Sequence, residues 1–236
     1  MFWRMTELAQ LVLARYVREG DRAVDATCGS GRDTLYLAER VGPTGTVYAF
    51  DIQEAALEAA KARLLARGLS NVVWIPASHA EMEAYVPEGV RAVVFNLGFW
   101  PEGPREIVTR TDTTRRALKA ALRLIAPGGV AVVVAYPGHE EGAKEAAMLE
   151  AFARRLPYPA YRAFDVRLTN APGVAGTIRA AEADPIAREG RSTRVGVGRM
   201  SSADDGQGAA DRSGPGVSSG VPPVLFVIEK HGEHWR

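Results

Sequence analysis

The sequence predicts an α/β fold in which helices cover both faces of a mostly parallel β-sheet. Three observations carry this prediction. Apolar, strand-like segments alternate with helix-forming segments at least five times between residues 22 and 134. One of them, Val-Ala-Val-Val-Val at 130–134, has no polar position and is typical of a parallel strand buried on both faces. Turns rich in glycine and proline separate the segments, among them 42–45 and 127–129.

The strands and helices follow one another in a regular order. Strands are expected where β-branched residues are frequent and turn residues follow. These segments are 22–25, 46–50, 72–75, 91–95 and 130–134. Helices are expected where apolar positions recur at helical spacing or helix-forming residues dominate. These segments are 7–18, 33–40, 53–67 and 112–125. A weaker strand at 162–168 and an apolar strand at 222–229 are expected to pair as an antiparallel hairpin, which gives seven strands.

Residues 171–220 have a composition unlike the rest of the chain. They contain ten glycines and almost no large apolar side chain. Such a segment buries too little apolar surface to offset the entropy that ordering costs. We therefore expect one domain, made of residues 1–170 and 221–236, that is interrupted by a low-complexity, disordered insertion.

The overall composition excludes several classes of protein. The net charge is +1, so any binding of nucleic acid must depend on local basic patches. No stretch of eighteen apolar residues is present, and the first residues are predicted to form an amphipathic helix without a signal-peptide cleavage site. We therefore expect no membrane association. The single cysteine, Cys28, cannot form an internal disulfide, which suits a cytoplasmic protein.

A glycine loop, DATCGSGRDT, joins the first predicted strand to its helix. Gly29 and Gly31 match the first two glycines of a dinucleotide fingerprint, but Thr34 occupies the third position. Asp25 precedes the glycines, and Asp51 ends the next strand twenty residues after Gly31. A carboxylate at this loop would repel a pyrophosphate and suits a cationic ligand. These features resemble the S-adenosylmethionine site of class I methyltransferases and favour a methyl donor over a dinucleotide.

This resemblance implies roles for the donor-binding residues. Asp25 would lie near the sulfonium or amino group of the donor, and Asp51 would accept hydrogen bonds from the ribose hydroxyls. Ser78 and His79, after the third strand, would contact the adenine edge. The candidate donor-binding residues are Asp25, Thr27, Gly29, Gly31, Asp33, Thr34, Asp51, Gln53, Ser78, His79, Asn96 and Gly98.

Two further loops, FNLGFWPEG and AYPGHEEG, follow the fourth and fifth strands. The first resembles the Asn-Pro-Pro-Tyr pattern of methyltransferases that act on amines, with Leu-Gly in place of the two prolines. An Asn side chain or loop carbonyl can hold a nitrogen, and an aromatic ring can stack on a base. An alkylamine is largely protonated at neutral pH, so the reaction needs a proton acceptor or a desolvated pocket.

The candidate residues of these two loops divide by role. The catalytic candidates are Asn96 to orient the amine and His139 or Glu140 to remove its proton. The substrate-binding candidates are Phe99, Trp100, Arg115 and Tyr136. We assign no metal ligand. The simpler alternatives are a strand-end turn with buried aromatic rings and a loop histidine that faces solvent or acts as a cap.

Several motifs are similar to those of a bacterial enzyme family. The matching segments are DATCGSGRDTLYLA, VYAFDIQEAAL, FNLGFWP, TRTDTTRRAL, LIAPGGVAVVVAYPGHEEG and PPVLFVIEK. In these motifs the chain resembles the tRNA 5-(aminomethyl)-2-thiouridine methyltransferases, earlier grouped with rRNA methylases. The resemblance implies a Rossmann-like class I methyltransferase fold and S-adenosylmethionine as cofactor. It also implies methylation of the aminomethyl nitrogen of the wobble uridine, so that the partner is the anticodon region of tRNA.

The chain departs from the family pattern at three places. Ser30 and Arg32 stand where Asn and His are expected, and Gly142 follows two glutamates instead of one. The insertion separates Asn170 from Pro222, which are otherwise joined by a short connection. The alternative functions are methylation of an rRNA base or a small amine, and donor binding without catalysis.

Basic residues after the FNLGFWPEG loop are the candidates for RNA contacts. They are Arg105, Arg110, Arg115, Arg116, Lys119 and Arg123. Several recur at helical spacing, so a solvated helix face explains them nearly as well. The sequence leaves open whether the chain forms a homodimer.

Overall fold

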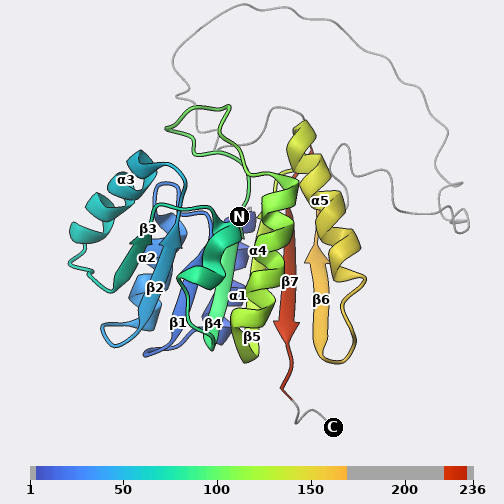
Figure 1. Ribbon diagram of the computed structural model, residues 1–236, viewed down its shortest axis with the longest axis horizontal. Helices are drawn as coiled ribbons and strands as arrows, with labels where there is room; N and C mark the ends of the chain where they lie inside the picture. Colours follow the sequence, from blue (N-terminus) through green and yellow to red (C-terminus); the bar gives the residue numbers. More distant parts are fainter. Residues whose placement is uncertain (1–3, 169–220, 233–236) are drawn as a thin grey trace, which may run out of the picture.

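Seven strands form one sheet in the computed structural model, which describes residues 4–168 and 221–232 (Figure 1). The strands are β1 (Arg22–Asp25), β2 (Thr46–Phe50), β3 (Val72–Ile75), β4 (Val90–Asn96), β5 (Ile125–Ala135), β6 (Tyr161–Val166) and β7 (Val224–Lys230). Their order is β3-β2-β1-β4-β5-β7-β6. The first five are parallel, and β7 pairs antiparallel with both β5 and β6. The predicted sheet with its antiparallel C-terminal hairpin is confirmed.

Helices cover both faces of this sheet. They are α1 (Met5–Tyr16), α2 (Arg32–Val41), α3 (Glu54–Leu65), the 3-10 helix η1 (His79–Ala84), α4 (Thr111–Leu124) and α5 (Glu140–Ala153). Figure 1 shows α4 and α5 in front of the sheet and α1 behind it. Two large apolar cores result, one under α4, α5 and η1 around Phe95 and Leu118, and one under α1 and α2 around Leu13 and Leu37. A smaller cluster lies around Leu57 of α3.

Three elements differ most from the sequence prediction. The 3-10 helix η1, which follows the third strand, was not expected. The helix α5 was not expected, because its first residues read as a glycine-containing loop; the His139 side chain in fact caps it by accepting a hydrogen bond from the Gly142 backbone N–H. Strand β5 starts at Ile125, five residues before the predicted strand, because Ile125 pairs with Val90 before the register shifts at Ala92. The predicted turn at 127–129 therefore lies inside the strand.

The parallel strands bring the predicted functional residues to one edge of the sheet. Asp25 and Asn96 are the last residues of β1 and β4, and Asp51 and Tyr136 directly follow β2 and β5. The predicted insertion at 171–220 lies outside the described residues. In residues 4–168 and 221–232, no helix has both the length and the apolar composition needed to cross a membrane.

Candidate functional site

The glycine loop after β1 is held in place by the end of β2. The Gly29 N–H donates to Asp51 Oδ2 at 2.8 Å, and the Gln53 N–H donates to Asp51 Oδ1 at 2.9 Å. Gly31 begins α2 in the left-handed conformation, with φ of 75°, and packs against Ala60 of α3. A Cβ at this position would lie 2.6 Å from the Ala60 Cβ, so only glycine fits. The loop therefore brings α2, α3 and the Asp51 carboxylate together.

A buried pair of carboxylates, Asp25 and Asp33, lies beside this loop. Asp25 accepts hydrogen bonds from the Thr34 hydroxyl at 2.6 Å and from the Thr27 N–H at 3.1 Å. Burial, together with the nearby Asp33 carboxylate, raises the pKa of Asp25 to about 7. Burial also raises the pKa of Asp33. Such a pair is costly to ionise without a cation beside it, so the site favours a positively charged ligand.

The carboxylate pair leads to a prediction about pH. An unfolded aspartate loses its proton near pH ~3.9, whereas Asp25 in the folded protein keeps its proton up to about pH 7. The folded chain therefore binds more protons over this window, and its free energy of unfolding falls as the pH rises. One pKa unit corresponds to about 1.4 kcal/mol, and Asp33 shares the proton, so we expect a loss of about 2 kcal/mol in the unliganded protein.

This loss is measured by urea unfolding at a series of pH values, for wild type and the Asp25→Asn variant. The wild-type protein should lose about 2 kcal/mol between about pH 5 and about pH 7.5 relative to the variant. Parallel stability curves for the two proteins would contradict a raised pKa at Asp25.

Asn96, the last residue of β4, links the pair Asp25 and Asp33 to the loop 97–110. Its backbone N–H donates to Thr27 Oγ1 at 2.7 Å, and its side chain donates a hydrogen bond to Asp33. Burial, and secondarily the charge of Asp33, raises the pKa of Tyr136, which directly follows β5, to about 12. The Gln10 side chain of α1 also donates to Asp33, at 3.2 Å. Side chains of α1 and β4 thus meet the Asp33 carboxylate of α2.

The loop 97–110 folds as a small hairpin with its ends bonded to each other. The Gly98 N–H donates to Thr109 Oγ1 at 2.9 Å, and the Thr109 N–H donates to the Gly98 carbonyl at 2.8 Å. Phe99 forms an isolated antiparallel bridge with Val108. The Arg105 guanidinium lies over the Phe99 ring, 5.7 Å from its centroid. The predicted substrate residue Phe99 therefore belongs to an ordered loop at the strand edge.

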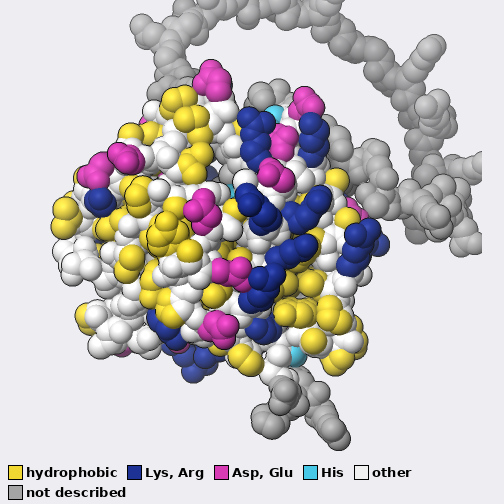
Figure 2. Space-filling view, in the orientation of Figure 1, with side chains coloured by type: hydrophobic (Ala, Val, Ile, Leu, Met, Phe, Trp, Pro, Cys, Tyr) yellow, Lys and Arg dark blue, Asp and Glu magenta, His cyan; other side chains and the backbone are white. Residues whose placement is uncertain are grey.

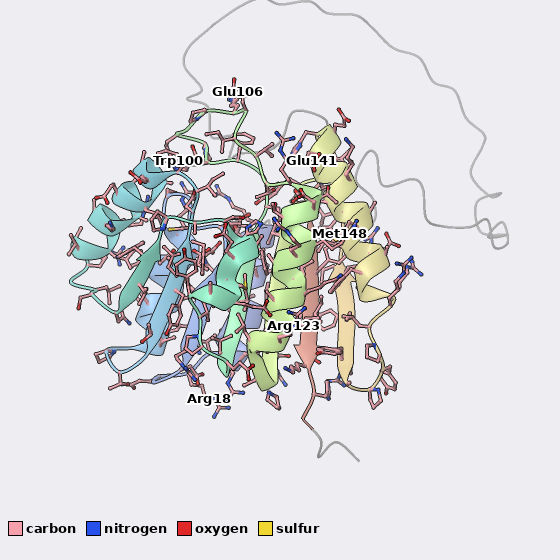
Figure 3. The ribbon with its side chains drawn as sticks, viewed as in Figure 1. Arg18, Trp100, Glu106, Arg123, Glu141 and Met148 are labelled. Atoms are coloured by element: carbon pink, nitrogen blue, oxygen red, sulfur yellow. The ribbon has the colours of Figure 1, made fainter. Side chains whose placement is uncertain are left out.

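Trp100 lies against the glycine loop (Figure 3). Its Cδ1 is 3.7 Å from the position that a Cβ on Gly29 would take, and Gly103 packs against its ring so closely that a Cβ there would lie 2.5 Å away. The indole Nε1 is buried and has no hydrogen-bond partner among the described residues. Trp100 was predicted to stack on the substrate; the structure places it beside the candidate donor site, and the stacking remains a prediction.

The two predicted proton acceptors, His139 and Glu140, lie at the start of α5. His139 Nδ1 accepts the Gly142 N–H at 3.1 Å, which caps α5 and leaves the proton of a neutral imidazole on Nε2. Nε2 is then a donor and cannot accept a proton while the cap is formed. Glu140 is exposed and pairs with Lys144 at 2.7 Å, which lowers the pKa of Glu140. The catalytic roles of His139 and Glu140 stay predictions.

His79 and Ser78 lie at the start of η1. Ser78 Oγ accepts from the Ala80 N–H at 3.2 Å and caps this helix. The His79 ring is buried, with Nδ1 at 3.1 Å from the Ala26 carbonyl, and burial lowers the pKa of His79. Its Nε2 is buried without a partner among the described residues. The predicted contact of His79 with the adenine edge remains untested.

Basic side chains lie along α4, the helix that follows the loop 97–110. Figure 2 shows Lys and Arg gathered in a band over this helix. The exposed members on α4 are Arg115, Arg116, Lys119 and Arg123. Arg123 pairs with Glu83 of η1 at 2.6 Å, so its charge is partly neutralised. The band supplies cationic groups on the helix that continues from the loop 97–110.

The sequence reasoning missed two residues of the site. Gln10 lies on α1, more than twenty residues from its partner Asp33, and no motif marks it. Glu145 lies on the unpredicted helix α5, is buried, and accepts hydrogen bonds from Thr109 and Thr114. The signal for Glu145 was a charged residue at the position in α5 that faces the core, which could be recognised only once the helix was known.

Comparison with protein families and curated proteins gives consistent matches. A family model described as "Putative rRNA methylase" matches residues 47–182, more than half of the chain. The tRNA (mnm(5)s(2)U34)-methyltransferase of Arabidopsis thaliana chloroplasts is 39% identical over 181 residues, which cover 72% of this chain and 66% of that protein. The demethylmenaquinone methyltransferase of Geobacillus stearothermophilus is 34% identical over 49% of this chain and 45% of that protein. This chain therefore spans only part of these two relatives, 66% of the first and 45% of the second.

Two solved structures resemble the whole chain. A protein from Clostridium thermocellum described as "Putative rRNA-methylase" is 28% identical with a TM-score of 0.74, and 98% of this chain aligns with 99% of that one. SMU.1697c from Streptococcus mutans, solved in complex with SAH, is 25% identical with a TM-score of 0.68, at the same coverage of both chains.

Proposed function

Because the chain belongs to the rRNA methylase family of S-adenosylmethionine-dependent methyltransferases, we propose that it methylates an amine on tRNA. The proposed acceptor is the aminomethyl nitrogen of 5-aminomethyl-2-thiouridine at the wobble position. The observation that carries this proposal is that Asp25, Asp33 and Asn96 lie together at the carboxyl ends of the parallel strands. It combines two buried carboxylates that suit a cationic donor with an amide that can hold a nitrogen.

The donor is proposed to lie across the ends of β1 and β2. A sulfonium or ammonium group near Asp25 and Asp33 would neutralise the pair, whose ionisation burial otherwise opposes. Asp51 would accept the ribose hydroxyls with the lone pairs that the Gly29 and Gln53 N–H groups leave free. The SAH bound to the Streptococcus mutans protein supports this choice of ligand.

The methyl transfer is an in-line displacement: the amine nitrogen forms a bond to the methyl carbon as the bond from carbon to sulfur breaks. The amine must be unprotonated and held at near-attack distance. Asn96 is proposed to orient it, because its position is fixed through Thr27 and Asp33. Enclosure by Tyr136 and the loop 97–110 would favour the neutral amine by limiting its access to water.

The tRNA partner is proposed to contact the basic band on α4. The anticodon region would place its phosphates along Arg115, Arg116 and Lys119. The wobble base would reach the site at the carboxyl ends of the parallel strands. The name of the Arabidopsis relative supports tRNA over rRNA. We propose the cytoplasm as the compartment; the relative is named chloroplastic. A homodimer is left open.

The proposal is tested by transfer of labelled methyl groups from S-adenosylmethionine. The acceptors are tRNA that carries the unmethylated aminomethyl uridine, rRNA and a free alkylamine. We expect label in tRNA alone, with nucleoside mass spectrometry placing one added methyl on the aminomethyl group. Label in rRNA or in the free amine would replace the proposed substrate. Donor binding without transfer would identify a binding module.

A tRNA-binding assay with the same tRNA tests the basic band. The double variant Arg115→Glu with Arg116→Glu should weaken tRNA binding by at least ~10-fold, since each residue is proposed to neutralise a phosphate. Arg18→Glu is the matched control, because Arg18 lies at the opposite edge of the sheet (Figure 3). Equal tRNA affinity in both proteins would leave the band as a solvated helix face.

A further inference from the structure

A buried carboxylate joins the hinge of the loop 97–110 to α5. Glu145 is 1% exposed. Its Oε2 accepts the Thr109 hydroxyl at 2.9 Å, and its Oε1 accepts the Thr114 hydroxyl at 2.6 Å. One turn earlier on α5, Glu141 Oε1 accepts both the N–H and the hydroxyl of Thr111, at 2.8 and 2.9 Å. Figure 3 places Glu141 at the amino end of α5.

The direction of these hydrogen bonds defines a chain from α5 to the end of β4. A backbone N–H can only donate, so the Thr109 hydroxyl accepts from Gly98 and its own proton points to Glu145. Gly98 lies two residues after Asn96. The intervening residue, Leu97, is buried, and its N–H donates to the Val134 carbonyl at 2.9 Å. The position of Glu145 thus bears on the backbone that follows Asn96.

A helix contact made for stability alone would not need this arrangement. Removing a carboxylate from water is costly, and apolar residues of similar size pack two helices at least as well. Burial accordingly raises the pKa of the Glu145 carboxyl. What a carboxylate with two hydroxyl donors adds is a fixed orientation, since each oxygen accepts from one threonine. This specificity is useful where a loop must be held in register.

We propose that Glu145 is a positioning residue for methyl transfer, which through Thr109 fixes Gly98 and so the Asn96 end of β4 and the loop 97–110. This inference rests on the proposed function for the step it affects. Glu145 itself touches neither donor nor acceptor. Thr114 uses the other oxygen of the same carboxylate but leads into α4 and not into the loop, so only the bond to Thr109 should matter for turnover.

Two isosteric substitutions, Thr109→Val and Thr114→Val, separate positioning from stability. Each removes one hydroxyl donor from Glu145 and keeps the side-chain shape. We expect Thr109→Val to lower kcat about 10- to 100-fold, the scale of a small misplacement of reacting groups. The dissociation constant for SAH should stay within about twofold in Thr114→Val, whose hydroxyl is bonded to Glu145 and to none of the candidate donor-binding residues. Thr114→Val should keep kcat within about threefold, and Thr109→Ser, which retains the hydroxyl, should restore it.

Melting temperatures and amide hydrogen exchange complete the test. The two valine variants should have similar melting temperatures, while exchange at Gly98 and Phe99 speeds up in Thr109→Val alone. If kcat falls equally in both variants, or in proportion to the melting temperature, Glu145 is a structural residue and the proposal is overturned. If wild type transfers no methyl group to RNA, the proposed function fails, and the exchange result still decides whether Glu145 holds the loop.

Discussion

Replacing Asp51 by alanine should lower the affinity for S-adenosylmethionine and SAH by about 100- to 1,000-fold. Two ribose hydroxyls bonded to one carboxylate contribute about 1.5–2 kcal/mol each, at the lower end of the range for hydrogen bonds to a charged group, which are stronger than those between neutral groups. A factor of ten in affinity corresponds to about 1.4 kcal/mol. Isothermal titration calorimetry measures the change directly.

Asp51 also holds the Gly29 and Gln53 N–H groups, so its loss could disturb the glycine loop without any contact to ribose. A 2′-deoxy analogue of SAH separates the two effects. In wild type the analogue should bind more weakly than SAH, and in Asp51→Ala the two ligands should bind equally, because the partner of the missing hydroxyl is gone. If the variant still prefers SAH over the analogue, the ribose lies elsewhere.

The order and position of the elements up to β5 were predicted closely because local signals define them. The bounds of β1, β2 and β3 agree with prediction to the residue. Each is a short β-branched segment flanked by turn or polar residues, so its ends are marked within the chain itself. The polar residues that end these strands then had to meet, because parallel strands share a carboxyl edge. Asp25 and Asp51 were found for this reason.

Sequence patterns could not predict the contacts between segments that lie far apart in the chain. The bonds of Gln10 to Asp33 and of Glu145 to Thr109 join segments 23 and 36 residues apart, and no spacing rule links them. Trp100 was assigned to the substrate from its loop alone, whereas its contact with Gly29 depends on how that loop folds back. Glu140 and His139 were assigned from a motif that turns out to begin a helix, where capping and a pair with Lys144 determine their contacts.

Replacing Gly31 by alanine should destabilise the protein by about 3 kcal/mol and weaken donor binding as well. The left-handed conformation, with φ of 75°, costs an alanine about 1 kcal/mol. The new Cβ would also lie 2.6 Å from the Ala60 Cβ and 2.9 Å from its Cα, and forcing α2 and α3 apart costs about a further 2 kcal/mol. Urea unfolding and SAH calorimetry measure the two effects.

Gly68 provides a control that isolates the crowding. It has nearly the same backbone angle, φ of 69°, but in the part of the chain that the structure describes no atom beyond its chain neighbours lies within 4 Å of the position its Cβ would take. Gly68→Ala should therefore cost only about 1 kcal/mol, the conformational part. The Ala60→Gly substitution, which costs about 1 kcal/mol in the wild-type helix, should cost less or even stabilise the Gly31→Ala protein. Equal costs for Gly31→Ala and Gly68→Ala would mean that α2 and α3 can separate freely, and the close approach at Gly31 would then not be what fixes the glycine loop.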